Sequence, residues 1–372
     1  MTTRERFEAI LNGKPPDKIP WLPRLELWYS GHVNRGTLSP EFQGLNLREI
    51  EKKLGLGTPA RQARVFSLSY RNLDFSREHK ENKEITEFDT PFGKVRQVFS
   101  RSSLTHRLGY DGMWTEYPLK SVEDIPAVEY IISHTEFEPD YKTYSDYDKE
   151  VGDDGFPMVV AGLDPFHEIL LRYTGYEFGY ILHHTHRQEF EQLLSVITGK
   201  FAERDEIILN SPAQLICIGQ HFDGQMTPPP IFKKYFLPYY QKLSDLLHAH
   251  GKKLACHADA DLTGLLELVE DAGFDMAECY TCAPMVSCTL EETRKVWGDK
   301  VIIWGGIPST LLTSAISEYE FRHYIDNLFK TIAPGDAIIL GIGDNVMPEA
   351  IWERFLYLSE VIEVRGNYPI IG

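Results

Sequence analysis

Short apolar runs alternate with longer amphipathic segments over the C-terminal part of the chain. The apolar runs are rich in β-branched residues, which is typical of buried parallel strands. Six strands are predicted in this way, over residues 157–162, 214–220, 253–257, 275–279, 301–305 and 337–341. The alternation predicts an α/β fold in which helices cover a parallel sheet.

The segments between the predicted strands carry helix signals. Residues 261–273 place leucines and Val269 on one stripe and end at a glycine, which is the pattern of a helix with one buried face. Thr289–Glu292 is a capping box, and Pro348 stands where a last helix is expected to open. Such a regular rhythm predicts a (β/α)8 TIM barrel from about residue 155 to residue 365. A doubly wound sheet is the alternative, but no GxGxxG motif follows a predicted strand.

The first 150 residues have a different pattern. Residues 2–11 read as a helix with Thr2 and Glu5 as its capping box, and residues 84–105 alternate about a Pro/Gly turn as a hairpin does. We therefore predict a barrel with an N-terminal helical and hairpin extension. One domain is expected over residues 1–372, with 1–150 as a cap and first barrel elements and 151–372 as the main barrel.

Composition narrows the function classes. The 372 residues carry 55 acidic and 38 basic side chains, a net charge of −17, which disfavours nucleic acid and anionic membranes as partners. The chain has no apolar run of membrane-spanning length, and its first residues are charged where a signal peptide is apolar. We expect a cytoplasmic protein, and the composition is compatible with a homodimer.

Polar side chains follow several of the predicted strands, at the end where barrel enzymes carry their active sites. His257 and Asp259 lie two residues apart, so both lean to one face, and Glu278 and Asp344 follow companion strands. Zinc accepts nitrogen, oxygen and sulfur ligands. The sequence thus predicts a metal site of these four residues. In the alternative, His257 and Asp259 form only a hydrogen-bonded pair.

Two cysteines are weaker candidates for the same metal. Cys279 and Cys282 have the spacing of half a zinc site or a redox pair, but no second CxxC motif exists. Cys217 and Cys256 stand within apolar runs, where cysteine is usually a small buried residue.

Other residues are candidates for the substrate. His221 and Asp223 flank Phe222 after a strand, and they are predicted either to orient the substrate and transfer a proton or to form a loop network. Aromatic residues suitable for an apolar substrate wall are Trp114, Tyr280 and Trp304, although most aromatic residues belong to the core.

Several of these segments together resemble the uroporphyrinogen decarboxylase superfamily. The resemblance covers nearly the whole chain and rests on the order of residues 4–13, 16–20, 221–225, 235–239, His257, 304–307 and 341–344. It implies a (β/α)8 barrel. The decarboxylase branch binds polycarboxylates without a cofactor through an N-terminal segment with arginines, of which residues 19–28 here hold only Arg24.

The other branch comprises zinc-dependent methyltransferases that work with a corrinoid on a partner protein. Their metal motif is His-x-Cys with a distant Cys, and here Asp259 and Asp344 stand at the two cysteine positions beside His257. An oxygen-rich zinc site suits an ether better than a thiol, because it is a stronger Lewis acid. The resemblance therefore implies a methyltransferase that moves a methyl group from a small methoxylated, aromatic substrate to a corrinoid protein. A cofactor-free decarboxylase and a non-catalytic binding barrel are the alternatives.

Overall fold

The computed structural model describes residues 1–371, and they form two compact units. The first unit comprises Met1–Ala63, Ser145–Ala161 and Ala213–Gly372, and the second comprises Arg64–Tyr144 and Gly162–Pro212. The first unit holds all six predicted strands and every candidate site residue except Trp114, while residues 162–212 of the predicted barrel range belong to the second unit. The expectation that residues 1–372 form a single domain stays a prediction.

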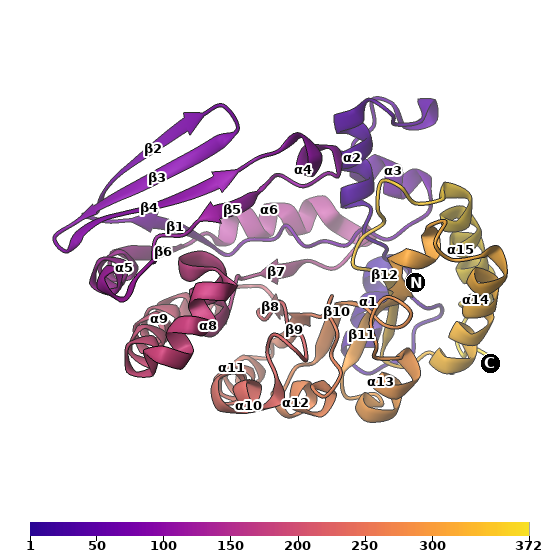
Figure 1. The fold of residues 1–372 in the computed structure, drawn as a ribbon. Helices are drawn as coiled ribbons and strands as arrows, with labels where there is room; N and C mark the ends of the chain where they lie inside the picture. Colours follow the sequence, from indigo (N-terminus) through magenta and orange to yellow (C-terminus); the bar gives the residue numbers. More distant parts are fainter. Residues whose placement is uncertain (372) are drawn as a thin grey trace. The chain divides into compact units, whose positions relative to one another are not determined.

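Six parallel strands form the central sheet of the first unit (Figure 1). They pair in sequence order and are β7 (Met158–Val160), β8 (Leu215–Cys217), β9 (Lys253–His257), β10 (Met276–Tyr280), β11 (Ile302–Pro308) and β12 (Ile338–Gly343). All six coincide with predicted strands to within a few residues. Their buried, mostly apolar sequences explain why no strand shows an alternating pattern, since both faces of a parallel sheet are covered.

Two N-terminal segments extend the sheet at its two edges. Trp21 makes a parallel bridge to Leu340 of β12, and Ala63 makes one to Val159 of β7. The Gly57 N–H donates to the Trp21 carbonyl at 3.0 Å, which joins the two segments to each other. The ring therefore has eight members, and the predicted (β/α)8 barrel is confirmed.

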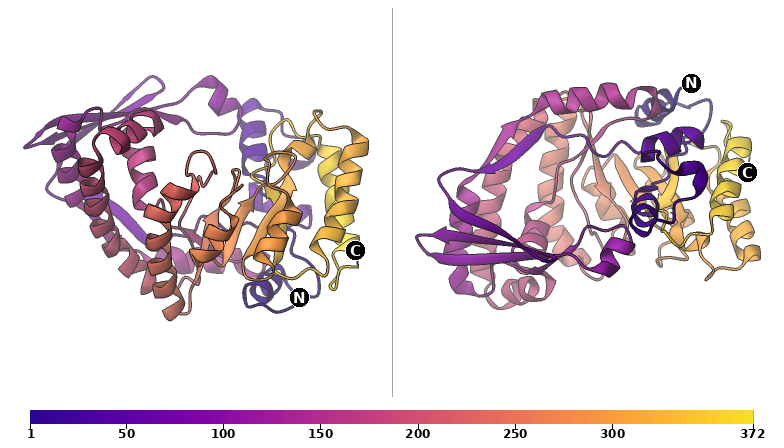
Figure 2. Two further views of the ribbon diagram at one scale, coloured as in Figure 1. Left: turned by 60° about the horizontal axis from the view of Figure 1, so that its bottom comes forward. Right: turned by 90° about the horizontal axis from the view of Figure 1, so that it is seen from above.

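Helices lie outside the strands of the first unit (Figure 2). Those that follow β8 to β12 are α11 (Leu237–Ala249), α12 (Leu266–Asp271), α13 (Leu290–Trp297), α14 (Glu318–Ile332) and α15 (Trp352–Arg365). Shorter pieces are α10 (Pro229–Ile231), η5 (Phe232–Phe236) and η6 (Ser309–Leu312), and the N-terminal and returning segments supply α1 (Thr3–Leu11), α2 (Glu26–Arg35), η1 (Pro40–Phe42), α3 (Leu47–Lys53), α6 (Tyr141–Val151) and η3 (Gly152–Asp154).

The helix signals in the sequence had different outcomes. The capping boxes that open α1 and α13 are confirmed, with both reciprocal hydrogen bonds present. The helix expected from residue 261 begins only at Leu266, because Asp261 accepts hydrogen bonds from Thr263 and holds a turn. The prediction that Pro348 opens the last helix is wrong, since α15 begins four residues later at Trp352.

The end of the barrel that receives the N-terminal helix is filled by apolar side chains. Phe7 of α1 is fully buried, stacks on Phe156 at 5.2 Å and meets Trp304 edge-on at 5.3 Å. These rings pack with Met276 and Ile339 of the strands in one hydrophobic cluster. Burying each such side chain stabilises the fold by about 1.5 to 3 kcal/mol. This end of the barrel is therefore core, and polar chemistry is left to the other end.

The second unit contains an antiparallel meander of β2 (Asp74–Lys80), β3 (Lys83–Thr90), β4 (Gly93–Ser100) and β5 (Met113–Glu116), and a separate pair of β1 (Phe66–Tyr70) with β6 (Thr135–Pro139). The predicted hairpin is confirmed as β3 and β4, but the outer strands were not foreseen. Phe88 and Val95 pack on Ile131. The helices are α4 (Ser103–Arg107), η2 (Val122–Asp124), α5 (Ile125–Ser133), α7 (Pro165–Glu168), η4 (Ile169–Thr174), α8 (Tyr176–Thr185) and α9 (Arg187–Leu209).

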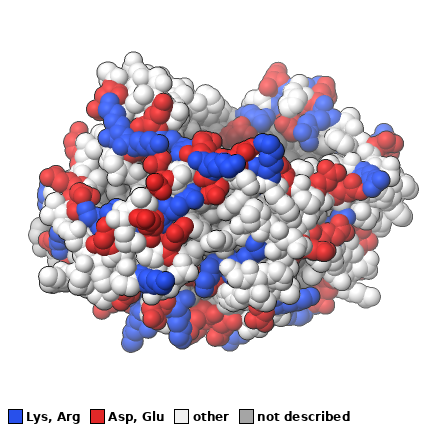
Figure 3. All heavy atoms as spheres, turned by 180° about the vertical axis from the view of Figure 1, so that it is seen from behind, with Lys and Arg blue, Asp and Glu red and all other residues white. Residues whose placement is uncertain are grey.

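The surface agrees with the charge expectation. Acidic and basic side chains are interspersed over the face in Figure 3 and do not gather there into one basic area. Among the described residues, no helix combines the length and apolar character that crossing a membrane requires.

Candidate metal centre

His257 is the central residue of a buried polar cluster at the C-terminal ends of the barrel strands. It ends β9, and the strand register places it beside Glu278 of β10. Its Nδ1 lies 2.7 Å from Glu278 Oε2, while its Nε2 lies 3.3 Å from Asp259 Oδ2 and 3.7 Å from Asp344 Oδ1. Glu278 thus fixes the ring, and Nε2 is the nitrogen that faces the two aspartates.

Cys279 enters the same cluster because β10 is irregular at this point. The pairing of β10 with β11 shifts between Glu278 and Tyr280, and Cys279 has a φ of 57°, in the left-handed region. Consecutive residues of a regular strand point to opposite faces. Here the Cys279 Sγ lies 2.8 Å from Glu278 Oε1, so both side chains reach one site. A β-bulge re-aims a side chain in this way.

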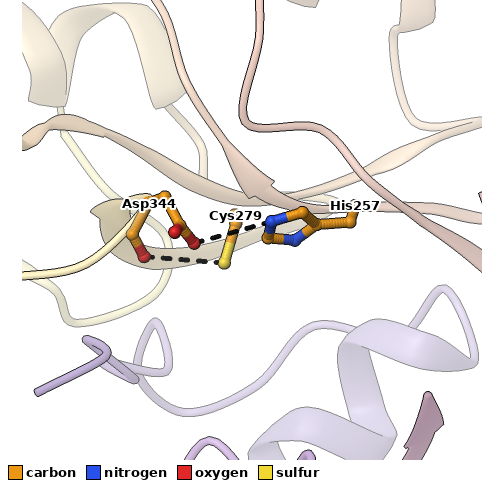
Figure 4. Close-up of side chains that lie close together, drawn as sticks. All are labelled: His257, Cys279 and Asp344. Atoms are coloured by element: carbon orange, nitrogen blue, oxygen red, sulfur yellow. Dashed lines mark hydrogen bonds and ion pairs between the residues drawn. The ribbon is translucent and has the colours of Figure 1, made fainter. Parts of the chain in front are cut away.

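Asp344 completes the cluster from the loop after β12. One ligand atom each from His257, Cys279 and Asp344 lies within 4.8 Å of the others (Figure 4). In the described part of the chain this is the one group of at least three His, Cys, Asp or Glu residues with that closeness. The candidate ligand set is therefore nitrogen, sulfur and oxygen.

Two arginines contact the cluster. Arg24 Nη1 donates to Cys279 Sγ at 3.1 Å and also to Asp344 Oδ1. Arg61 Nε lies 2.9 Å from Glu278 Oε1, the oxygen that Cys279 Sγ also contacts, and Arg61 Nη2 lies 3.4 Å from His257 Nδ1. Arg61 was not predicted from the sequence, because it lies in the edge segment of the barrel around Ala63, which has no strand-like apolar run. Arg24 was noted only for the family resemblance.

The charges of the cluster stabilise one another. The positive charges of Arg61 and His257 outweigh burial and hold the pKa of Glu278 well below its usual range. Burial disfavours the His257 imidazolium, but the charge of Glu278 and hydrogen bonds to Asp259 and Cys279 raise the pKa of His257. Burial, above all, raises the pKa of the Cys279 thiol to about 12. Without a cation, the site is thus a set of compensating charges around a neutral thiol.

The donor set fits a divalent metal such as zinc. Imidazole nitrogen, thiolate and carboxylate oxygen are the ligands that zinc takes, and a second group usually holds the imidazole in place, as Glu278 does here. Asp259 Oδ1 is buried without a hydrogen-bond partner among the described residues. The other oxygen of this carboxylate, Oδ2, faces His257, and a cation would satisfy a buried carboxylate oxygen that has no partner.

The structure revises the predicted ligand set. His257 and Asp344 are brought together as predicted, with Asp259 beside them. Glu278 contacts Nδ1 of His257 and also pairs with Arg61. Its carboxylate therefore holds the His257 ring in place and is not itself one of the candidate ligand groups. Cys279 takes that place.

Cys282, the other cysteine of the CxxC spacing, belongs to a separate contact. Its Sγ lies 3.3 Å from the hydroxyl of Tyr324 and 3.6 Å from the carbonyl of Gly306. Burial raises the pKa of the Cys282 thiol to about 12. The side chain anchors the loop after β10 to α14 and β11.

His221 and Asp223 lie in the loop after β8. His221 has a φ of 60°. Burial raises the pKa of Asp259, but the hydrogen bond and charge of His257 and the charge of His221 lower it by more, so the net pKa is below its usual value. Asp223 Oδ1 accepts the backbone N–H groups of Gln225 and Met226 at 2.8 and 3.0 Å. Asp223 therefore shapes its own loop, while His221 lies near the cluster.

The proposed substrate wall is corrected at two of its members. Tyr280 is fully buried, packs on Trp297 at 5.6 Å and contacts the hydroxyl of Thr293. Trp304 is buried in the apolar cluster at the other end of the barrel. Neither ring has a free face for stacking. Trp114 is half-buried in β5 and packs edge-on against Phe99 within the second unit.

A cavity of about 480 Å³ adjoins the cluster within the first unit. Arg24 and Arg61 belong both to its wall and to the cluster. The other lining residues include Glu26, Arg48, Glu51, Lys52, Thr58, Gln62 and Tyr147. Its volume suits a small molecule, and its wall is markedly polar.

Comparison with known proteins places this architecture in a family. Residues 117–363 match the family model of Uroporphyrinogen decarboxylase (URO-D). A solved structure, a methyltransferase from Methanosarcina mazei, has a similar fold, with a TM-score of 0.59 and 14% sequence identity over 98% of this chain and 99% of that one. No curated protein matches the sequence. Because the family model spans more than half of the residues and the barrel agrees with it, the chain belongs to the uroporphyrinogen decarboxylase (URO-D) family.

Proposed function

We propose that the protein is a metal-dependent methyltransferase that moves a methyl group from a small methoxylated, aromatic compound to a corrinoid carried by a partner protein. The observation that carries the proposal is the convergence of His257, Cys279 and Asp344 at the carboxyl ends of three barrel strands. The similar solved structure is that of a methyltransferase, which supports the same class of reaction.

The residues of the cluster have distinct tasks in this proposal. His257 offers Nε2 because Glu278 holds Nδ1, and Cys279 and Asp344 offer sulfur and oxygen. A bound zinc ion would polarise the ether oxygen of the substrate and so make the phenolate a better leaving group. Asp259 stands 3.3 Å from His257 Nε2 and supplies a further oxygen donor.

The rest of the reaction falls to groups around the cluster. His221, near Asp259, orients the substrate or carries the proton that the released phenolate takes up. The adjoining cavity of about 480 Å³ holds the body of the substrate. A reduced corrinoid on the partner protein would accept the methyl group and supply the electron pair of the new bond, and the phenolate would leave with the electrons of the broken bond.

Metal analysis and a coupled assay test the proposal. The full chain, purified without a histidine tag, should hold one equivalent of zinc, and His257→Ala should lose the metal but keep its circular dichroism spectrum. With reduced corrinoid and methoxylated benzoates, methylcobalamin should accumulate in step with the demethylated product. A wild-type protein that binds no stoichiometric metal in zinc-containing buffer would contradict the proposal.

A second candidate is a cofactor-free decarboxylase, favoured by one observation. Arg24 and Arg61 both line the cavity, and a pair of guanidinium groups suits a substrate carboxylate. Release of carbon dioxide from a carboxylated substrate by metal-free protein would favour this candidate. The thiol of Cys279 within the cluster argues for the methyltransferase, because decarboxylation gives it no task.

A further inference from the structure

Arg24 occupies a position that a metal would need. Its Nη1 hydrogen bonds to Cys279 Sγ and to Asp344 Oδ1, which are two of the three candidate ligand atoms. The side chain is mostly buried, with 12% of it exposed. The guanidinium is therefore a cation already seated in the donor cluster.

A divalent ion and this guanidinium cannot share the cluster. Like charges a few ångströms apart repel strongly in a partly buried site. The lone pairs of Cys279 and Asp344 that accept from Arg24 are also those that would face the ion. Arg61 differs in this respect, because its ion-pair partner is Glu278, which holds His257 Nδ1 and is not one of the three candidate ligands.

Arg24 has an alternative partner outside the donor cluster. Its other terminal nitrogen, Nη2, lies 3.4 Å from Glu26 Oε2, and both residues line the cavity of about 480 Å³. Glu26 is half exposed and holds its partner weakly at that distance. A guanidinium turned toward the cavity would face whatever ligand the cavity holds, with five N–H donors that match a carboxylate.

We propose that Arg24 is an internal counter-ion that competes with the metal for Cys279 and Asp344 and, once displaced, binds an anionic group of the substrate in the adjoining cavity. This inference rests on the proposed metal-dependent function and adds a substrate class to it, a methoxylated carboxylate. It also couples the two ligands. A carboxylate that holds Arg24 in the cavity promotes metal binding, and by linkage the metal promotes carboxylate binding by the same factor.

Cobalt(II) titration of the full chain tests the competition, because the sulfur-to-cobalt charge-transfer absorption reports binding at Cys279 without any turnover. Arg24→Gln should bind cobalt at least tenfold more tightly than the wild type, and Arg24→Lys, which keeps the charge, should stay near the wild type. Arg48→Gln is the matched control: Arg48 lines the same cavity but pairs with Glu150 and Asp154, and its substitution should change the affinity less than twofold.

The coupling is measured on the wild type with 4-methoxybenzoate, with methoxybenzene as the uncharged comparison. The carboxylate should tighten cobalt binding severalfold, methoxybenzene should not, and Arg24→Gln should abolish the effect. A folded Arg24→Gln variant that binds cobalt no more tightly, or a wild type without carboxylate coupling, would overturn this inference alone. Absence of cobalt binding in every variant would overturn the proposed function and this inference together.

Discussion

Glu278 Oε2 lies 2.7 Å from Nδ1 of His257, and its other oxygen lies 2.9 Å from Arg61 Nε. The buried carboxylate of Glu278 therefore orients the imidazole of His257 and also neutralises the guanidinium of Arg61, which comes from the barrel segment around Ala63. Glu278→Gln should lower metal affinity by about ten- to a hundredfold, because loss of a group that orients a ligand has effects of that size. Isothermal titration with zinc measures it.

The control for this prediction is Glu267→Gln, an exposed residue on α12. It should leave zinc affinity unchanged. If Glu278→Gln binds zinc as tightly as the wild type and is folded, the carboxylate does not orient the ligand.

Replacement of the thiol separates the two cysteines of the CxxC spacing. Cys279→Ser should lose the sulfur-to-cobalt absorption and weaken cobalt binding at least tenfold, because a hydroxyl is a poor metal ligand at neutral pH. Cys282→Ser, at a buried cysteine bonded to Tyr324, is the matched control and should keep both. Retention of the absorption in Cys279→Ser would show that the ligand is misassigned.

The stability of the protein should depend on pH through Glu51. This residue is buried on α3, and burial raises its pKa from 4.5 to about 7 against the effects of the Thr58 hydrogen bond and the charge of Arg48, with Asp154 and Glu26 adding to the rise. Between pH 4.5 and about 7 the folded state holds a proton on Glu51 that the unfolded state has lost. The contribution of Glu51 to stability is therefore greatest below pH 4.5 and is lost as the pH rises to about 7.

Glu51→Gln should remove this loss. The free energy of unfolding of the variant minus that of the wild type should be about zero at acidic pH. This difference should rise to about 3 kcal/mol at most above neutrality, which is the free energy of such a pKa change. Denaturant unfolding at several pH values measures it. A constant difference between the two proteins across that range would contradict a neutral buried carboxyl.

The packing of the N-terminal helix into the barrel predicts a large loss of stability at Phe7. The ring is fully buried between Phe156 and Trp304, so Phe7→Ala should lower the free energy of unfolding by about 3 to 5 kcal/mol. Phe92→Ala, at a ring 61% exposed in the turn between β3 and β4, should cost less than about 1 kcal/mol. Similar losses at both positions would be inconsistent with this core.

The barrel could be predicted from the sequence because its strands are buried on both faces. Runs such as residues 254–256 and 337–341 are apolar throughout, and polar residues follow each of them. The first two barrel segments were expected within residues 1–150, but their positions were not predicted. They pair through single bridges at Trp21 and Ala63, and such short contacts leave no apolar run in the sequence.

The candidate site was predicted in part for a similar reason. His257 and Asp344 follow recognisable strands, so their meeting could be expected. Cys279 was only a weaker candidate, because its place beside His257 depends on a bulge that turns Cys279 to a φ of 57°. Strand alternation, the rule that sequence reasoning uses, fails where the backbone gains an extra residue.

The bridge between Trp21 and Leu340 also has a consequence for synthesis of the chain. Residues near the start close a ring with a strand near the end, so the Trp21 segment and β11 each lack a neighbour until β12 has left the ribosome. Open strand edges invite pairing with other chains, and contacts between distant residues form slowly. A nascent chain arrested before residue 338 should therefore require chaperone binding to stay in solution, whereas the completed chain protects its own edges.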